Sequence, residues 1–202
     1  MVCRPSSSDL SPAAISAKIV IAGAFGAGKT TFVRSISEIE PLTTEAPMTE
    51  TSAETDDLSA APDKTTTTVA VDFGRTSLDD DLILYLFGMP GQERFWFLWD
   101  DLVCGALGAV VLADPRRLAD CFPVIEYFEN VPDVPFVVAL NCFDGKLPYE
   151  IEDVRTALAI DPGVPLLTCD ARDTAAVACT LTELVGYAIN LTNNDPALVH
   201  MR

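Results

Sequence analysis

Short apolar runs alternate with amphipathic segments along most of the chain. Six runs rich in Val, Ile, Leu and Phe are predicted to be buried strands, at residues 18–22, 69–73, 82–87, 109–113, 135–140 and 164–169. Helical stretches separate most of these runs, which is typical of a mostly parallel sheet with helices on both faces. We therefore expect a three-layer α/β/α fold around a six-stranded sheet.

Two segments refine this expectation. Between the second and third runs, the polar segment 78–81 is too short for a crossover helix, so these two strands are expected to form an antiparallel hairpin at one edge of the sheet. Between Thr174 and Thr192, apolar residues recur at spacings of three and four, which predicts a helix docked on the sheet.

Other segments are predicted to lack regular structure. Residues 1–17 are rich in Ser, Pro and Ala, and residues 41–63 combine three prolines with repeated Thr, Glu and Asp. Such composition buries too little apolar surface to offset the entropy of folding. We expect a disordered N-terminal tail, one domain over 18–192 with an acidic insertion at about 41–63, and a C-terminal tail at 193–202.

Composition narrows the class of protein. The 202 residues include 13 basic and 30 acidic side chains, for a formal net charge of −17, which argues against binding to nucleic acid or to anionic membranes. Six scattered cysteines without a CxxC pair indicate reduced thiols rather than a disulfide framework or a zinc site. No apolar run approaches the length of a membrane span, so we expect a cytoplasmic protein that reaches a membrane only through a partner.

The residues from Gly23 to Thr30 match the pattern G-x-x-x-x-G-K-[ST], between an apolar strand and a predicted helix. In this context the pattern marks a phosphate-binding loop (P-loop), whose backbone N–H groups and helix N-terminus surround phosphate oxygens. Lys29 is expected to reach the β- and γ-phosphates, and Thr30 to bind Mg²⁺. The predicted nucleotide-binding residues of this segment are Gly23, Phe25, Gly26, Ala27, Gly28, Lys29, Thr30 and Thr31.

Four further motifs follow in order, at residues 65–73, 88–95, 141–144 and 168–172. Together with the P-loop, over roughly residues 18–192, they resemble the motifs of the Ras-like small GTPases. The resemblance implies a P-loop fold that binds GTP and GDP with Mg²⁺ and hydrolyses GTP. It also implies that the segments around Thr68 and Gly91 are the two switch regions.

The resemblance assigns roles to individual residues. Thr68 would complete the Mg²⁺ shell, the Gly91 N–H would bind the γ-phosphate, and Gln92 would orient the attacking water. Asn141 and Asp144 would form the guanine motif, in which the Asp144 carboxylate accepts hydrogen bonds from the base. The Ala171 N–H would contact the guanine O6.

More narrowly, the string from Phe87 to Leu102, with Asp72-Phe73-Gly74 and residues 141–145, resembles the MglA-like GTPases of actinobacterial conservons. This resemblance implies a bacterial source. It also implies three partners encoded in the same operon, namely a roadblock-type protein, a small helical protein and a sensor-kinase-like membrane protein.

Three positions depart from the Ras-like pattern. Gly88 replaces the aspartate that supports Mg²⁺ through water, which predicts weaker Mg²⁺ affinity. Phe25 replaces a glycine and would crowd the approach of an activator's arginine, which predicts slow turnover. Cys142 replaces the lysine that covers the base and ties down the P-loop, which predicts lower nucleotide affinity, with a packing role for its thiol.

Two groups of side chains beside the switches leave alternatives open. Arg75 and Arg94 are candidates for a catalytic arginine in the same chain, or are solvent-facing charges. Trp99 is expected in the core, whereas Trp96 and Phe97 are each candidates for core packing or for contact with a partner.

The leading interpretation is a molecular switch that hydrolyses GTP slowly. A second is a degenerate nucleotide-binding scaffold without turnover, against which the presence of Gln92 argues. A third is a small-molecule kinase, which normally needs an arginine-bearing lid, whereas residues 41–63 contain no arginine. The acidic insertion itself is either a passive loop or a tether for a basic partner.

Overall fold

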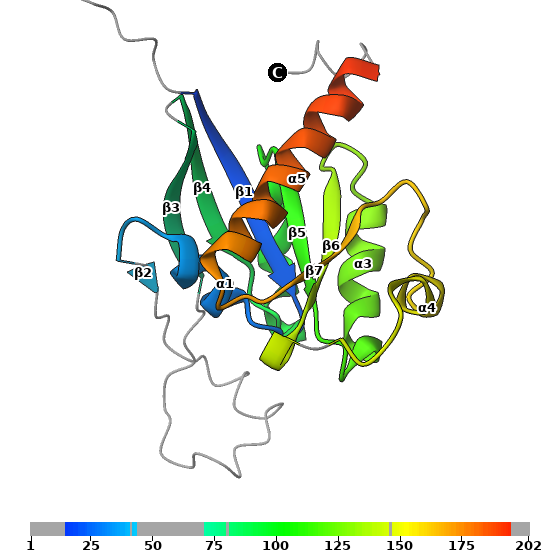
Figure 1. The fold of residues 1–202 in the computed structure, drawn as a ribbon. Helices are drawn as coiled ribbons and strands as arrows, with labels where there is room; N and C mark the ends of the chain where they lie inside the picture. Colours follow the sequence, from blue (N-terminus) through cyan, green and yellow to red (C-terminus); the bar gives the residue numbers. More distant parts are fainter. Residues whose placement is uncertain (1–14, 41, 44–70, 80, 146, 195–202) are drawn as a thin grey trace, which may run out of the picture.

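The fold is a seven-stranded sheet between two layers of helices (Figure 1). The structure is a computed structural model that describes residues 15–40, 42–43, 71–79, 81–145 and 147–194. Its strands are β1 (Ile15–Gly23), β2 (Leu42–Thr43), β3 (Asp72–Asp79), β4 (Leu82–Gly88), β5 (Gly108–Ala113), β6 (Phe136–Asn141) and β7 (Leu166–Cys169). They lie in the order β2-β3-β4-β1-β5-β6-β7.

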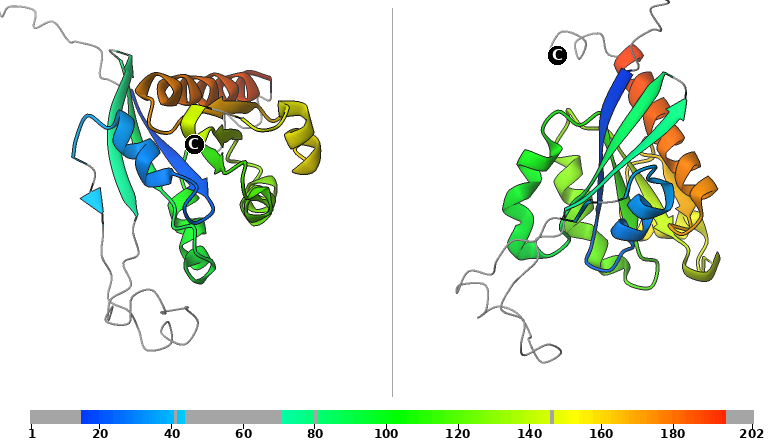
Figure 2. Two further views of the ribbon diagram at one scale, coloured as in Figure 1. Left: turned by 60° about the horizontal axis from the view of Figure 1, so that its bottom comes forward. Right: turned by 90° about the vertical axis from the view of Figure 1, so that its left-hand side faces the viewer.

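The described residues form five α-helices and three short 3₁₀ helices, which lie between the strands or, for the last helix, after them. The α-helices are α1 (Lys29–Ile36), α2 (Trp99–Val103), α3 (Phe122–Glu129), α4 (Ile151–Ala157) and α5 (Thr174–Asn194). The 3₁₀ helices are η3 (Glu93–Leu98), η4 (Leu118–Cys121) and η5 (Phe143–Gly145). One apolar cluster packs α1 and α5 on one face of the sheet, and a second packs α2, α3 and α4 on the other (Figure 2).

The predicted α/β P-loop fold is confirmed. Strands β4, β1, β5, β6 and β7 are parallel, and every residue of β5 and β6 is buried because helices cover both faces of the sheet. The predicted hairpin is also present, since β3 pairs with β4 in antiparallel fashion. The sheet departs from the expected six strands because residues 42–43, at the start of the predicted acidic insertion, add a short antiparallel strand beside β3.

The hairpin contains an irregularity that determines which side chains face each other. Asp79 pairs with Leu82, whereas Ser77 pairs with Ile83, so the register shifts by one residue at Leu78. Such a β-bulge exchanges the faces of all residues beyond it. As a result Asp72, at the far end of β3, lies directly opposite Gly88 of β4.

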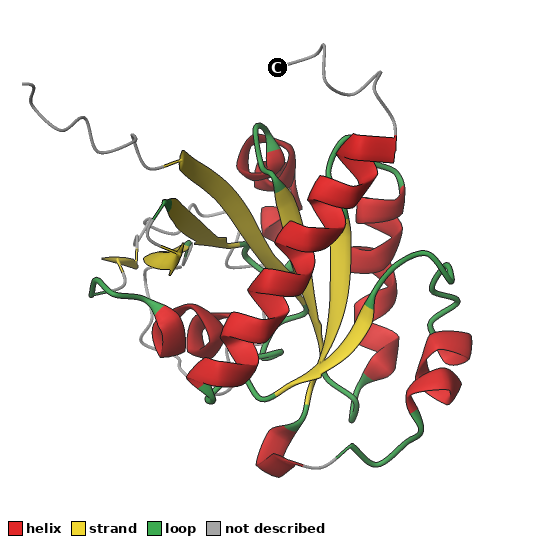
Figure 3. Ribbon diagram, turned by 45° about the horizontal axis from the view of Figure 1, so that its top comes forward, coloured by secondary structure: helices red, strands yellow, loops and turns green. Residues whose placement is uncertain are grey.

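Helix α5 packs along the sheet as the spacing of its apolar residues predicts (Figure 3). Val177, Leu181, Leu184 and Ala188 are buried, while Leu191 at the end of the stripe is exposed. By length and composition alone, Thr174–Asn193 is also apolar enough to cross a membrane, although polar residues interrupt its apolar runs. The buried stripe on this helix explains its apolar composition, because these side chains pack on the sheet.

The ends of the chain and the acidic insertion are only partly described. Strand β1 begins at Ile15, three residues before the expected boundary, and α5 continues to Asn194. The remainder of the predicted tails, residues 44–63 of the insertion and Thr68 of the first switch lie outside the described residues. Residues 69–70 of the second predicted strand lie outside them as well, so this strand is described only from Asp72.

Candidate functional site

The P-loop joins the end of β1 to the start of α1, as the sequence predicts. Gly26 and Gly28 have φ values of 80° and 105°, a conformation that residues with a side chain rarely adopt. At Gly28 a Cβ atom would also lie 2.4 Å from the Asn141 amide nitrogen. Glycine is therefore needed twice, for the backbone conformation and for the close approach of a neighbouring strand.

Lys29 folds back over the loop that precedes it. Its Nζ donates hydrogen bonds to the carbonyl oxygens of Gly23 and Ala24, both at 2.8 Å. Burial lowers the pKa of Lys29 to about 8, although the nearby Asp72 carboxylate favours the charged form. An anion in the loop would supply stronger acceptors than these carbonyls, which suits the ammonium group to phosphate binding.

Beside Lys29, the first helical turn meets a carboxylate from β3. Thr30 Oγ1 donates a hydrogen bond to Asp72 Oδ2 at 2.5 Å. Asp72 is 4% exposed, and its Oδ1 is buried without a hydrogen-bond partner among the described residues. Sequence reasoning missed this residue, which lies across from Gly88, where a carboxylate was expected and is absent. A carboxylate is therefore present beside Thr30, supplied by the neighbouring strand.

The second switch lies directly against the P-loop. A Cβ atom on Gly91 would come within 2.7 Å of backbone atoms of Ala24 and Phe25 and within 2.6 Å of Lys29 Nζ. Trp99 Nε1 donates to the Pro90 carbonyl at 3.0 Å, which anchors this segment to α2. Only glycine fits at position 91, and a phosphate group entering between the switch and the lysine would move this segment.

Gln92 follows Gly91 and is held by a neighbour. Arg94 Nη2 donates to Gln92 Oε1 at 2.9 Å, and the Arg94 guanidinium lies 4.7 Å from the centre of the Phe95 ring. Arg75, the other candidate for a catalytic arginine, forms an ion pair with Glu38 at 2.5 Å on the outer edge of the sheet. Arg94 therefore contacts a predicted catalytic residue, whereas Arg75 pairs on β3.

The base-binding side is built around Asn141 at the end of β6. Asn141 Nδ2 donates to the Ala27 carbonyl at 2.9 Å, and its Oδ1 accepts from the Ala171 N–H at 3.1 Å. Asn141 therefore joins the P-loop to the loop after β7. The Ala171 N–H, expected at the base, would have to exchange this bond for one to a nucleotide. Asp144 belongs to η5, but its side chain lies outside the described part of the chain.

Cys142 has the packing role that the sequence predicts. It is 8% exposed, its Sγ lies 3.5 Å from the Leu140 carbonyl, and burial raises the pKa of its thiol. Such a thiol is poorly reactive. It also offers no cation to the P-loop where the Ras-like pattern has lysine.

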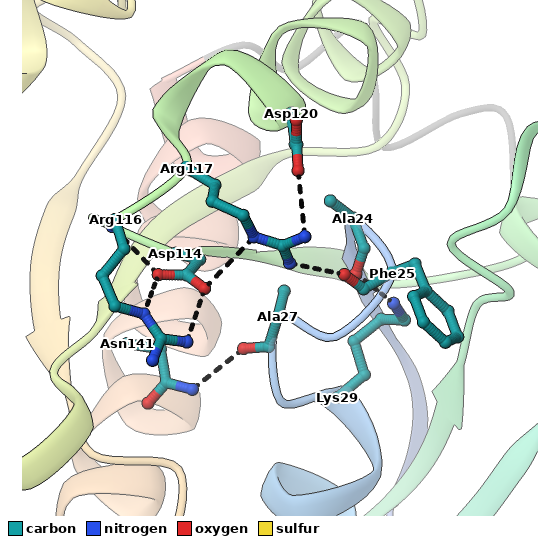
Figure 4. Close-up of polar contacts among 9 residues, drawn as sticks. All are labelled: Ala24, Phe25, Ala27, Lys29, Asp114, Arg116, Arg117, Asp120 and Asn141. Carbon is teal, nitrogen blue, oxygen red and sulfur yellow. Dashed lines mark hydrogen bonds and ion pairs between the residues drawn. The ribbon is translucent and has the colours of Figure 1, made fainter. Parts of the chain in front are cut away.

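A group of charged residues after β5 contacts the P-loop from the other side (Figure 4). Arg117 Nη2 donates to the Phe25 carbonyl at 2.8 Å, and its guanidinium also pairs with Asp114 and Asp120 at 3.7 and 3.4 Å. The Arg116 guanidinium donates two hydrogen bonds to the Asp114 carboxylate and the Arg116 backbone N–H donates a third, which hold the pKa of Asp114 below its usual range. The sequence places this pair of arginines shortly after a buried strand, and parallel strands end at the same edge of the sheet as the P-loop. That position was the available signal, and the role of the pair was missed.

The remaining predicted residues lie at the rim of the site. Phe25 and Thr31 are exposed, with Phe25 at 66%. Phe97 is 73% exposed, whereas Trp96 packs with its ring centre 5.0 Å from that of the buried Trp99. Trp96 thus packs against the core, whereas Phe97 faces outward and stays a candidate for contact with a partner.

Comparison with known proteins agrees with this geometry. A family model described as "Conserved hypothetical ATP binding protein" matches residues 21–191. A search of curated proteins finds no match.

Among solved structures, the G domain of the T. maritima FeoB iron transporter has a TM-score of 0.57 at 14% identity, covering 87% of this chain and 98% of that domain. The Arl6 BBS3 small GTPase from Trypanosoma brucei, solved with a bound nucleotide analogue, has a TM-score of 0.62 at 15% identity, covering 87% and 99%. The elongation factor SelB of Methanococcus maripaludis, in complex with a GTP analogue, has a TM-score of 0.57 at 14% identity. The match covers 88% of this chain and 34% of SelB. At these identities the likeness shows a shared fold.

Proposed function

Since the chain belongs to the family of conserved hypothetical ATP-binding proteins, we propose that it is a guanine-nucleotide switch that binds GTP and GDP with Mg²⁺ and hydrolyses GTP slowly. The observation that carries this proposal is the contact of Gly91 with the P-loop and Lys29. A γ-phosphate bound at Lys29 would displace this segment, whereas loss of that phosphate would let it return. A kinase would not need such an arrangement.

The choice of guanine over adenine rests on the motif from Asn141 to Asp144. A carboxylate pairs with the two N–H donors of guanine, and adenine would leave it unpaired at a cost of about 1–3 kcal/mol. The family description names ATP, and the solved structures of similar fold include proteins bound to GTP analogues. The base preference is therefore the first property to test.

The residues beside the P-loop fit a magnesium ion. Thr30 Oγ1 donates its proton to Asp72 and keeps a lone pair for a metal, and the buried Asp72 Oδ1 is available to accept from a metal-bound water. Together with Thr68, these residues would hold the ion. When bound, Mg²⁺ would neutralise charge on the β- and γ-phosphates.

Three residues of the chain would act in hydrolysis. Lys29 would stabilise charge on the transferred phosphoryl group, the Gly91 N–H would bind the γ-phosphate, and Gln92 would orient the attacking water. Arg94 donates a hydrogen bond to the Gln92 side-chain oxygen, so this arginine would compete with the attacking water for that oxygen. Together with exposed Phe25 at the entrance, this supports slow turnover in the absence of a partner.

Two exposed aromatic residues beside the nucleotide site support signalling through a partner. Phe25 on the P-loop and Phe97 after the second switch are both largely exposed, and large exposed apolar side chains commonly contact other proteins. By the resemblance to MglA-like conservon GTPases, the partners are a roadblock-type protein, a small helical protein and a sensor-kinase-like membrane protein. The sensor-kinase-like membrane protein would recruit a cytoplasmic bacterial switch to the membrane.

The proposal is tested by calorimetric titration of nucleotide-free protein with GDP, GTP and ATP, with and without Mg²⁺. We expect guanine nucleotides alone to bind tightly, and GTP to be hydrolysed over hours. The Lys29→Met variant is the control, since it removes the phosphate contact. Comparable binding of ATP would refute guanine specificity, and guanine binding without hydrolysis would identify the scaffold instead of the switch.

A further inference from the structure

The P-loop of this protein lacks the support that the Ras-like pattern provides through a lysine. Cys142 occupies that position, and its buried thiol, which donates to the Leu140 carbonyl at 3.5 Å, offers no cation to the loop. Lys29 holds the carbonyls of Gly23 and Ala24, and Asn141 holds the carbonyl of Ala27, so the peptide between Phe25 and Gly26 needs a further group to fix it. The structure shows such a group on the opposite side of the loop.

Arg117 contacts the loop at one peptide unit. Its Nη2 lies 2.8 Å from the Phe25 carbonyl oxygen, and a Cβ atom on Gly26 would lie 3.2 Å from the same nitrogen. The guanidinium therefore packs on the peptide between Phe25 and Gly26. In a trans peptide the carbonyl and the N–H point in opposite directions, so a carbonyl turned toward Arg117 turns the Gly26 N–H away from it.

Carboxylates fix the guanidinium in this place. Its Nε lies 3.7 Å from Asp114, which is 2% exposed, and its Nη1 lies 3.4 Å from Asp120. Figure 4 shows Arg117 reaching the loop from the end of β5, while Lys29 reaches it from α1. The two cations thus meet the loop from different elements.

We propose that Arg117 is a positioning residue, which orients the Phe25–Gly26 peptide so that the Gly26 N–H faces a bound nucleotide phosphate. From the loop after β5, Arg117 would stabilise the P-loop as the guanine-motif lysine does in the Ras-like pattern. The inference rests on the proposed function only in requiring that a nucleoside diphosphate or triphosphate binds the P-loop. It does not depend on the base.

The test compares Arg117→Ala with a matched control. Arg155 also donates to backbone carbonyls, at 3.1 Å to Asp161 and 3.0 Å to Val164, but it lies on α4, outside the candidate site. The probe is the fluorescent nucleotide N-methylanthraniloyl-GDP. Its dissociation is followed after addition of excess unlabelled GDP.

Arg117→Ala is expected to accelerate dissociation about tenfold or more, the change that corresponds to one charge-assisted hydrogen bond. Arg155→Ala is expected to leave dissociation unchanged while lowering the unfolding temperature. Arg117→Lys should restore part of the affinity because it keeps one charged donor. Because Arg117 is argued to act through the Phe25–Gly26 peptide, Arg117→Ala should raise KM for GTP by a larger factor than it lowers kcat.

The inference would be overturned if Arg117→Ala released the fluorescent nucleotide at the wild-type rate. It would also be overturned if Arg155→Ala accelerated release as much as Arg117→Ala does. If Arg117→Ala does not fold, Asp120→Asn replaces it, since this variant loosens the guanidinium and should also accelerate dissociation. If the protein binds N-methylanthraniloyl-ADP and not the guanine probe, guanine specificity fails, while the same comparison of variants with the ADP probe still tests Arg117. If neither nucleotide binds, both proposals fail.

Discussion

Replacement of Asp72 by alanine tests the metal site most directly. Asp72 accepts a hydrogen bond from Thr30 Oγ1 and holds a second, unpartnered oxygen in the same buried space. Its removal deletes the support for a metal-bound water and also frees the Thr30 hydroxyl. We expect Asp72→Ala to fold, because alanine fits the space and the variant no longer buries an incompletely satisfied carboxylate.

The magnitude follows from the interactions that are lost. A hydrogen bond to a charged group contributes about 1.5–3 kcal/mol, which corresponds to roughly ten- to a hundredfold in Mg²⁺ affinity. The assay measures GDP dissociation with Mg²⁺ and again with a chelator. In the wild type the chelator should accelerate release strongly. In Asp72→Ala, release should already be fast and respond little to the chelator.

Two further variants separate charge from shape and position. Asp72→Asn keeps an acceptor for Thr30 without the charge, so its Mg²⁺ affinity should fall almost as far as in the alanine variant. A Cβ atom on Gly88 would lie 3.1 Å from the Asp72 Cβ, so the double variant Asp72→Ala with Gly88→Asp returns a carboxylate to the site and should recover part of the affinity. Unchanged dependence on Mg²⁺ in Asp72→Ala would refute the assigned role.

Three other predictions follow from the site. Gly91→Ala should weaken GTP binding more than GDP binding, because the methyl group would crowd Lys29 and the P-loop backbone beside the N–H that is expected to bind the γ-phosphate. Calorimetry measures this, and wild-type GTP affinity would contradict it. The pKa of Lys29 is lowered from 10.5 to about 8 in the folded protein. Between these pH values the unfolded chain binds more protons than the folded one, so the free energy of unfolding should rise with pH. This rise should disappear in Lys29→Met, as denaturant titration at several pH values will show. A thiol reagent should label the exposed Cys104 and Cys179 in the native protein. The three buried cysteines should react only after unfolding, namely Cys121, Cys142 and Cys169. Mass spectrometry locates the label, and labelling of these three in the native protein would refute their burial.

Local patterns in the sequence predicted most of the fold. The P-loop, the hairpin and the buried stripe of α5 each depend on residues close together in the chain. Their spacing determines backbone conformation or the face that is buried. The short strand at Leu42–Thr43 was missed because its pairing with β3 depends on a partner about thirty residues away, and two residues carry no periodic signal.

Asp72 was missed because of the bulge at Leu78. Continuing the register of Asp79 with Leu82 would pair Phe73 with Gly88 and place Asp72 on the other face of the sheet. The inserted residue reverses this arrangement. The sequence contains no strong marker of the bulge, so the partner of Gly88 follows only from the folded hairpin.

Arg117 was missed for a different reason. Its contact with the Phe25 carbonyl joins residues 92 positions apart and depends on the loop conformation after β5. A charged residue on a loop most often faces solvent, and half of this side chain does so. Only the position of the guanidinium between Asp114 and the P-loop distinguishes Arg117 from an ordinary surface arginine.

The pairing of Asp72 with Gly88 has a consequence for comparing homologous sequences. The two Cβ positions lie so close that two carboxylates there would repel each other, whereas none would leave Thr30 without its acceptor. An acidic residue at one position therefore favours a small neutral residue at the other. In an alignment each column would look variable when considered alone, although the pair is constrained, so a search for an aspartate in one fixed column would reject proteins that build the same site from the adjacent strand.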